Sequence, residues 1–201
     1  MTDRFDDFDD EPEAAPQLAD LPRLQAVARF SRMVPLVAWF RAVGEPLGET
    51  DEAEARDYID ALGFPDAYVT PVATWEDAEA AIRNPDWNTD WWEAEEQLRA
   101  GLITEALLEV SERDLMVALT AVTTQVSDVV HGAAAVAAAR GGSADQALIR
   151  AAAGAATQVC YQAALVLAAG GDDSHPFALK YRLFEAGRWP LGIVGSSFNI
   201  F

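Results

Sequence analysis

Residues 131–169, HGAAAVAAARGGSADQALIRAAAGAATQVCYQAALVLAA, contain 17 alanines among 39 residues. Alanine favours helix, and its small side chain allows two helix backbones to approach closely. A Gly-Gly pair at 141–142 interrupts the run, and Ser143 can open a new helix. We therefore expect one helix over about 112–139 and a second over 143–169. The stretch predicts a tightly packed antiparallel helix hairpin at the centre of a mainly α fold.

Helix signals continue on both sides of this hairpin. Residues 21–44 have roughly helical apolar spacing, and Pro35 predicts a kink or a break within them. Residues 64–73 contain two prolines and are expected to be extended or irregular. Further helices are expected over about 50–62, 74–83, 90–110 and 177–186.

The C-terminal segment 189–201, WPLGIVGSSFNIF, is apolar and contains β-branched residues. Its Val194-Gly195-Ser196-Ser197 sequence suits a two-residue turn with glycine first, so we expect a small terminal β-hairpin. Such an apolar segment either packs on the domain or joins a partner chain. Homo-oligomerisation therefore stays an open alternative.

The formal net charge of −19 is distributed unevenly. Residues 1–20 carry −7 and too little apolar surface to offset the cost of ordering, so we expect a disordered acidic arm. Residues 115–201 contain five acids and five bases. We therefore expect one helical domain over 21–201, with acidic covering helices over 21–110 and a neutral scaffold over 111–201.

The composition argues against several classes of protein. A strongly acidic chain repels nucleic-acid phosphates, so nucleic-acid binding is not expected. The single cysteine, Cys160, excludes an internal disulfide framework and a multi-cysteine zinc site. No basic segment followed by an apolar stretch opens the chain, which predicts a cytoplasmic protein without a secretory signal.

A membrane span is also not expected, because charged residues and a histidine interrupt the apolar region. These residues are Asp128, His131, Arg140, Asp145 and Arg150.

Several catalytic patterns are weak in this sequence. Asp128-x-x-His131 has the spacing of helix-bundle metal sites, but those sites repeat the motif, and the only other histidine is His175. We therefore expect His131 to be a packed core residue. Cys160 lies between apolar neighbours and is expected to be inert packing. No nucleophile elbow or phosphate-binding loop is present, and no cofactor is expected.

Two glutamate pairs support an alternative enzymatic interpretation. Glu93-x-x-Glu96 and Glu109-x-x-Glu112 each place two carboxylates one helical turn apart, as Mg²⁺ sites on helices require. The pairs resemble half of the MazG-like nucleotide pyrophosphatase pattern. That resemblance implies an all-α, Mg²⁺-dependent hydrolase in which these four glutamates hold the metal. The sequence lacks the family's second pair ending in Asp, and no nearby base is placed to bind phosphate.

A binding function is the leading interpretation. Phe5 and Phe8 stand among acids in the arm, a pattern typical of a short docking segment, although a merely solubilising tail has the same composition. The second half of the acidic region combines tryptophans with acids, and these aromatics either face a partner or form core. The candidate residues there are Trp87, Trp91, Trp92, Glu93 and Glu96. We expect a soluble interaction or regulatory protein that binds a basic protein surface without catalysis.

Overall fold

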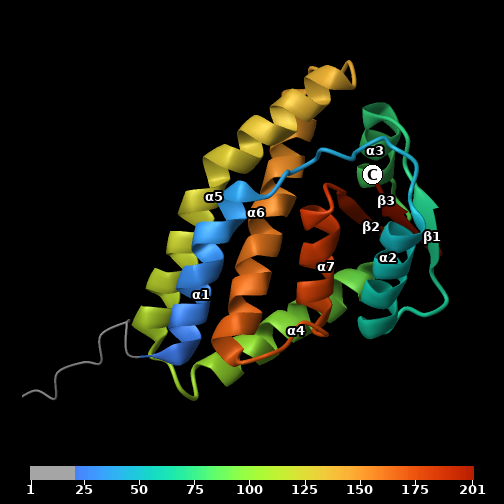
Figure 1. The fold of residues 1–201 in the computed structure, drawn as a ribbon. Helices are drawn as coiled ribbons and strands as arrows, with labels where there is room; N and C mark the ends of the chain where they lie inside the picture. The colour runs from blue at the N-terminus through green and yellow to red at the C-terminus, as the bar shows by residue number, and fades with distance from the viewer. Residues whose placement is uncertain (1–20) are drawn as a thin grey trace, which may run out of the picture.

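The computed structural model describes residues 21–201, which form a mainly α-helical fold with a small sheet (Figure 1). The predicted arm, with Phe5 and Phe8, lies outside the described residues. The elements are α1 (Pro22–Met33), η2 (Val34–Leu36, a 3₁₀ turn), α2 (Glu49–Ala61), β1 (Tyr68–Pro71), α3 (Trp75–Ile82), α4 (Thr89–Ala106), α5 (Glu112–Arg140), α6 (Gln146–Ala169), α7 (Pro176–Glu185), β2 (Pro190–Val194) and β3 (Ser197–Ile200).

The predicted hairpin of two long helices is confirmed. α5 and α6 lie antiparallel along their length, with α1 packed against both (Figure 1). Ser111 caps α5 as expected, because its hydroxyl accepts a hydrogen bond from the Asp114 N–H at 3.2 Å. The start of α6 differs from the prediction. Asp145, and not Ser143, is the cap, because one Asp145 carboxylate oxygen accepts the N–H groups of both Ala147 and Leu148.

Small side chains form much of the contact between α5 and α6. Buried alanines line both helices: Ala134, Ala137, Ala138, Ala152, Ala153, Ala156 and Ala164. Leu119, Val122 and Val126 continue the buried stripe toward the start of α5. The alanine-rich composition therefore has the role expected for it, since it lets the two backbones pack closely.

The first helix breaks where the sequence indicates, but it does not resume. α1 ends at Met33, and Pro35 lies in the short 3₁₀ turn. The expected continuation to residue 44 is wrong, because Phe40 adopts a left-handed backbone conformation (φ +56°). Its fully buried ring packs edge-on against Phe184 and Trp189, with centroids 6.2 and 6.3 Å apart. Tertiary packing of one aromatic thus overrides helical spacing.

The sheet contains the predicted terminal hairpin and one unexpected strand. β2 and β3 pair antiparallel around Gly195 and Ser196, and β1 pairs parallel with β3, giving the order β1-β3-β2. The C-terminal segment packs on the domain, since Phe198, Ile200 and Phe201 are at most 2% exposed. Of the two alternatives expected for residues 64–73, extended or irregular, the extended one holds for Tyr68–Pro71, and the partner of this strand lies far away in sequence.

A buried arginine fastens the C-terminal part of the chain to the acidic half. The Arg188 guanidinium is 4% exposed and donates to Asp51 at 2.7 Å. It also donates to three backbone carbonyls, those of Ala42, Glu45 and Pro46. The two sequence halves therefore interlock, and the acidic helices do more than cover a separate scaffold.

One helix of the described residues, α6, is long and apolar enough to cross a membrane. The charged residues expected to interrupt the apolar region do not interrupt this helix, because residues 151–169 carry no charge and Arg150 lies only at their edge. In the fold, 61% of the most apolar window is buried, as in the core helix of a soluble protein.

Candidate functional site

The candidate site lies where α4 begins against the C-terminal hairpin. The Asn88 N–H donates to the Ile193 carbonyl at 3.0 Å, and the Asn88 side-chain oxygen accepts the Trp91 N–H at 3.0 Å. Asn88 is therefore the cap of α4, which begins one residue earlier than the helix expected over about 90–110. The same residue fixes the first turn of α4 beside β2.

Two of the three predicted binding tryptophans face inward. Trp91 is 7% exposed and donates its indole N–H to the Tyr58 hydroxyl at 3.1 Å. Trp87 is half-buried and donates to the Ile82 carbonyl at 2.8 Å. Their rings lie 5.7 Å apart over Gly192, whose φ of +119° and close ring contacts leave no room for a Cβ. Both residues are structural in this fold.

Trp92 and Glu93 remain at the surface. The Trp92 side chain is 58% exposed, and Glu93 is exposed beside it. Glu96 is half-buried and forms an ion pair with Arg99, whose hydrogen bond lowers the Glu96 pKa. Of the five candidate residues on α4 and its lead-in, the structure therefore leaves Trp92 and Glu93 as the exposed, unpaired pair.

A small cavity lies beside Asn88, the cap of α4. It has a volume of about 230 Å³ and lies between the loop 63–67, Asn88 and the β2–β3 turn. Exposed Asp66 lines it, and Asn88 and Trp92 are four residues apart, which puts them on one side of α4. We call Asp66, Asn88, Trp92 and Glu93 the acid–tryptophan surface.

Beneath this surface lies a buried polar cluster that the sequence analysis missed. Glu95 is 4% exposed, and one of its carboxylate oxygens accepts from the Tyr58 hydroxyl and from the Lys180 ammonium, both at 2.5 Å. Its other oxygen accepts from the Gln162 amide at 3.4 Å. The Lys180 nitrogen also lies 5.4 Å from the centre of the Trp91 ring. Four helices, α2, α4, α6 and α7, are joined at this one carboxylate.

Burial and charge within the Glu95 cluster shift the ionisation of Tyr58. Burial, followed by the negative charge of Glu95, raises the Tyr58 pKa well above its usual value. The Gln162 side-chain oxygen is buried and accepts no hydrogen bond from the described residues. We interpret the Glu95 cluster as structural, because all four of its polar side chains lie in the interior.

A sequence signal for Glu95 did exist. On α4, Trp91, Leu98, Leu102 and Ala106 follow helical spacing, and Glu95 occupies the one remaining position on that stripe. A carboxylate on an apolar stripe predicts a buried cation, and Lys180 is the only lysine of the chain. The Glu-x-x-Glu pattern drew attention to its neighbours at 93 and 96 instead.

The structure does not bring the two predicted metal pairs together. Glu93 and Glu96 lie near the start of α4, whereas Glu109 and Glu112 lie beyond its far end, about 20 Å along the helix. Glu109 forms an ion pair with Arg23 at 2.8 Å, and Glu112 is exposed. Within residues 21–201, no group of three or more His, Cys, Asp or Glu side chains is placed to hold a metal ion.

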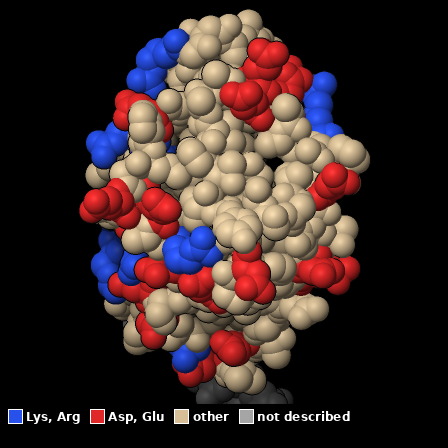
Figure 2. Space-filling model, turned by 90° about the vertical axis from the view of Figure 1, so that its right-hand side faces the viewer, with Lys and Arg blue, Asp and Glu red and all other residues tan. Residues whose placement is uncertain are grey.

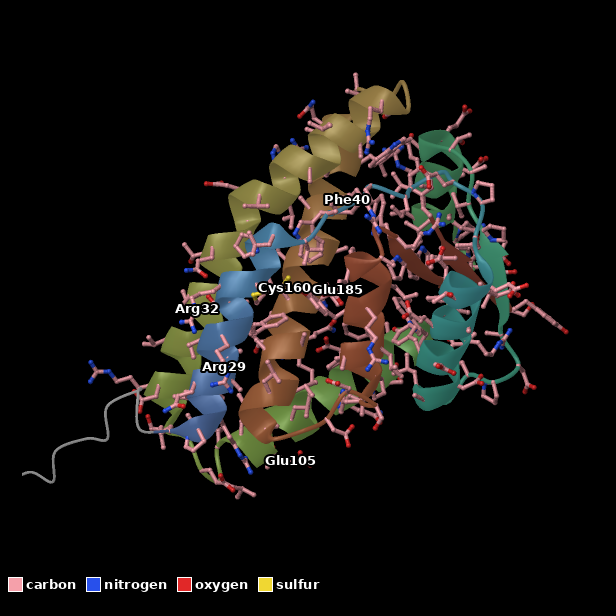
Figure 3. The ribbon with its side chains drawn as sticks, viewed as in Figure 1. Arg29, Arg32, Phe40, Glu105, Cys160 and Glu185 are labelled. Atoms are coloured by element: carbon pink, nitrogen blue, oxygen red, sulfur yellow. The ribbon has the colours of Figure 1, made fainter. Side chains whose placement is uncertain are left out.

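The predictions for the two remaining candidates, His131 and Cys160, have different outcomes. The expectation that His131 is a core residue is wrong, because it is exposed on α5 beside the α6 residues Arg150 and Thr157. Cys160 is buried as expected, and burial raises its thiol pKa to about 12. Figure 3 shows its sulfur within the helical layer, near α1 and α6. Such a thiol is inert at neutral pH.

No protein-family model matches the chain, and neither a curated protein nor a solved structure shows significant similarity to it.

Proposed function

We propose that the protein is a soluble interaction or regulatory protein that binds a basic protein surface without catalysis. The observation that carries the proposal is the exposure of the Trp92 ring and of the Glu93 carboxylate, which forms no ion pair with a described residue, near the start of α4, whose cap Asn88 lines the same cavity as Asp66. The acid–tryptophan surface is the site that we assign to this contact.

Charge supports the proposal. Asp66 and Glu93 form no ion pair with any residue of the described part of the chain. Figure 2 shows the face that carries α2, β1 and α3, where acidic side chains, with basic ones among them, surround a largely uncharged area. A field of this sign speeds the encounter with a basic partner and opposes an acidic one.

The chemistry of the surface fits lysine and arginine. An indole ring attracts a cation placed over its face, and tryptophan is among the residues that most often dominate binding energy. A cavity of about 230 Å³ with a carboxylate at its edge suits one long basic side chain. Trp92 then supplies apolar contact while Asp66 and Glu93 pair with the charge.

The test is affinity capture from a lysate of the source cells by the immobilised full-length chain. The variant Trp92→Ala/Glu93→Lys is compared with Glu105→Lys, which makes the same charge change at an exposed position farther along α4 (Figure 3). We expect the unaltered chain to capture basic proteins at low salt. The double variant is expected not to capture them, whereas the Glu105→Lys control still does. Removing a dominant aromatic costs about 2 kcal/mol, or roughly 30-fold in affinity.

Equal capture by all three chains would contradict the proposal, as would capture of neutral or acidic proteins alone. A second assay addresses the hydrolase alternative. Thermal unfolding is followed with Mg²⁺ and a nucleoside triphosphate, and we expect no shift. A rise of several degrees that Glu93→Gln or Glu109→Gln abolishes would replace the binding proposal with the enzymatic one.

A further inference from the structure

An apolar groove runs between α1 and α5. It has a volume of about 480 Å³, and Leu24, Val27 and Ala118 form its floor. Val117 is 50% exposed on one side, and Ala28 and Ala121 are exposed along the groove. Small side chains at these positions leave a hollow large enough for aromatic rings.

One arginine lines the groove, and a second lies one turn away on the same helix; neither has an acidic partner among the described residues. Arg32 lines it, and Arg29 lies one turn earlier on α1 (Figure 3). Both are exposed, and neither forms an ion pair with a residue of the described range. Residues 21–44 contain four arginines and no acid. The groove is therefore apolar with a basic border, on a molecule that is otherwise acidic.

We propose that residues 1–20 of the same chain dock in this groove, with Phe5 and Phe8 on its apolar floor and the adjacent aspartates facing Arg29 and Arg32. The proposal is independent of the acid–tryptophan surface. It gives Phe5 and Phe8 a site within their own chain, where the sequence analysis gave them a partner protein.

The sequence of the segment complements the groove. Residues 1–20 carry eight acids and one base, and Asp6, Asp7, Asp9 and Asp10 surround Phe8. The acidic part of the domain repels such a segment, because residues 45–114 carry a charge of −16, whereas residues 115–201 are neutral. α1 attracts it, and the groove beside α1 accepts its two aromatic rings.

The length of the segment also fits. Phe8 and Leu21 are thirteen positions apart, and α1 begins directly after Leu21. A flexible chain of that length has a root-mean-square span of about 20 Å. The far end of the groove, at Arg32, lies about 16 Å along α1 from Leu21. Phe8 therefore reaches every part of the groove without stretching.

Attachment favours this occupant over a second copy. A short flexible connection gives an effective concentration on the order of 1 mM, so even a contact with a dissociation constant of about 1 mM is half-formed. A second chain at micromolar concentration competes poorly with it.

Paramagnetic relaxation in the full-length chain tests the proposal. A nitroxide is attached at a Thr2→Cys substitution, and the buried Cys160 thiol stays unlabelled. We expect selective broadening of the amide signals of Ala28, Val117 and Ala121. The broadening is expected to be equal at about 20 and about 200 µM protein, since docking within one chain does not depend on concentration.

Matched variants separate the contributions. Phe5→Ser/Phe8→Ser is expected to abolish the broadening, whereas Leu18→Ser, the same change elsewhere in the segment, keeps it. Arg29→Gln/Arg32→Gln is expected to weaken it, whereas Arg140→Gln/Arg150→Gln, which removes equal charge elsewhere, leaves it unchanged.

Three results would overturn the proposal. The first is the absence of broadening at the groove. The second is broadening that persists in Phe5→Ser/Phe8→Ser. The third is broadening of an isotope-labelled, nitroxide-free chain mixed with a nitroxide-bearing one, which would assign the groove to a second copy.

Discussion

The α5–α6 hairpin and the junction of α2, α4 and α7 are held together by different chemistry. Every buried residue of α5 is apolar, and many of those on α6 are alanine. The junction instead buries Glu95 and Lys180, with the Arg188–Asp51 pair nearby. Apolar packing depends on the pattern along one helix, whereas the polar junction depends on pairs that the fold brings together. The two regions should therefore fail in different ways.

The largest expected effect is at the junction. Lys180→Met leaves the Glu95 carboxylate buried without its cation, and removal of one partner from a buried ion pair costs about 3–5 kcal/mol. Urea unfolding of the variant measures the loss. In the double variant Glu95→Gln/Lys180→Met no charge is buried there, so we expect at least half of the stability to return. A double variant less stable than Lys180→Met would contradict this expectation and show that the hydrogen bonds of the Glu95 carboxylate to Tyr58 and Gln162 outweigh the cost of its unpaired charge.

A smaller effect is expected in the hairpin. Ala156 on α6 is 0% exposed, so Ala156→Leu overpacks the interior around this helix at a cost of about 1–3 kcal/mol. Ala151→Leu makes the same change at an exposed position of α6 and is expected to alter stability by less than about 0.5 kcal/mol. Thermal unfolding compares the two. Equal effects at both positions would contradict the close packing of α5 and α6.

The smallest expected effect is at His175, in the connection between α6 and α7. His175 caps α7, because its Nδ1 accepts the Phe177 N–H at 3.1 Å. Burial lowers the His175 pKa, partly opposed by Glu105 and Asp172, so the unfolded chain takes up the proton first as the pH falls. The contribution is complete above the unfolded pKa of about 6.5 and is lost as the pH falls through the lower folded value.

Unfolding at pH 7 and pH 5 measures this contribution as the difference between the native chain and His175→Asn. Between pH 7 and pH 5, we expect the free energy of unfolding to fall by up to about 1 kcal/mol more in the native chain than in His175→Asn, because asparagine caps the helix at both pH values. An identical pH dependence in the two chains would remove His175 from the account.

The sequence predicted the parts of the fold that depend on local pattern. Examples are the alanine-rich stretch, the break at Pro35 and the turn at Gly195. In each case the signal lies in the same residues that form the helix, break or turn. The pairing of β1 with β3 could not be predicted in this way, because Thr70 and Asn199 lie far apart in sequence. The turn of the chain at Phe40 likewise depends on Phe184 and Trp189, which come much later.

The candidate site was predicted only in part for the same reason. Trp91 and Trp92 are adjacent and chemically identical; the apolar stripe of α4 passes through Trp91, which packs against Tyr58, while Trp92 stays exposed. Glu93 was identified as a surface acid, while Glu95 was overlooked although it lies on the apolar stripe of α4. The sequence therefore identified the segment at the start of α4, and the fold determines which of its side chains are exposed and available to bind.

The most direct measurement for the binding proposal is hydrogen exchange of the full-length chain, with and without the basic protein recovered by affinity capture. We expect slower exchange in residues 63–68 and 88–96, the segments that contain the acid–tryptophan surface, and unchanged exchange in α5 and α6. Slower exchange confined to the α5–α6 hairpin, with both of those segments unaffected, would contradict the binding proposal.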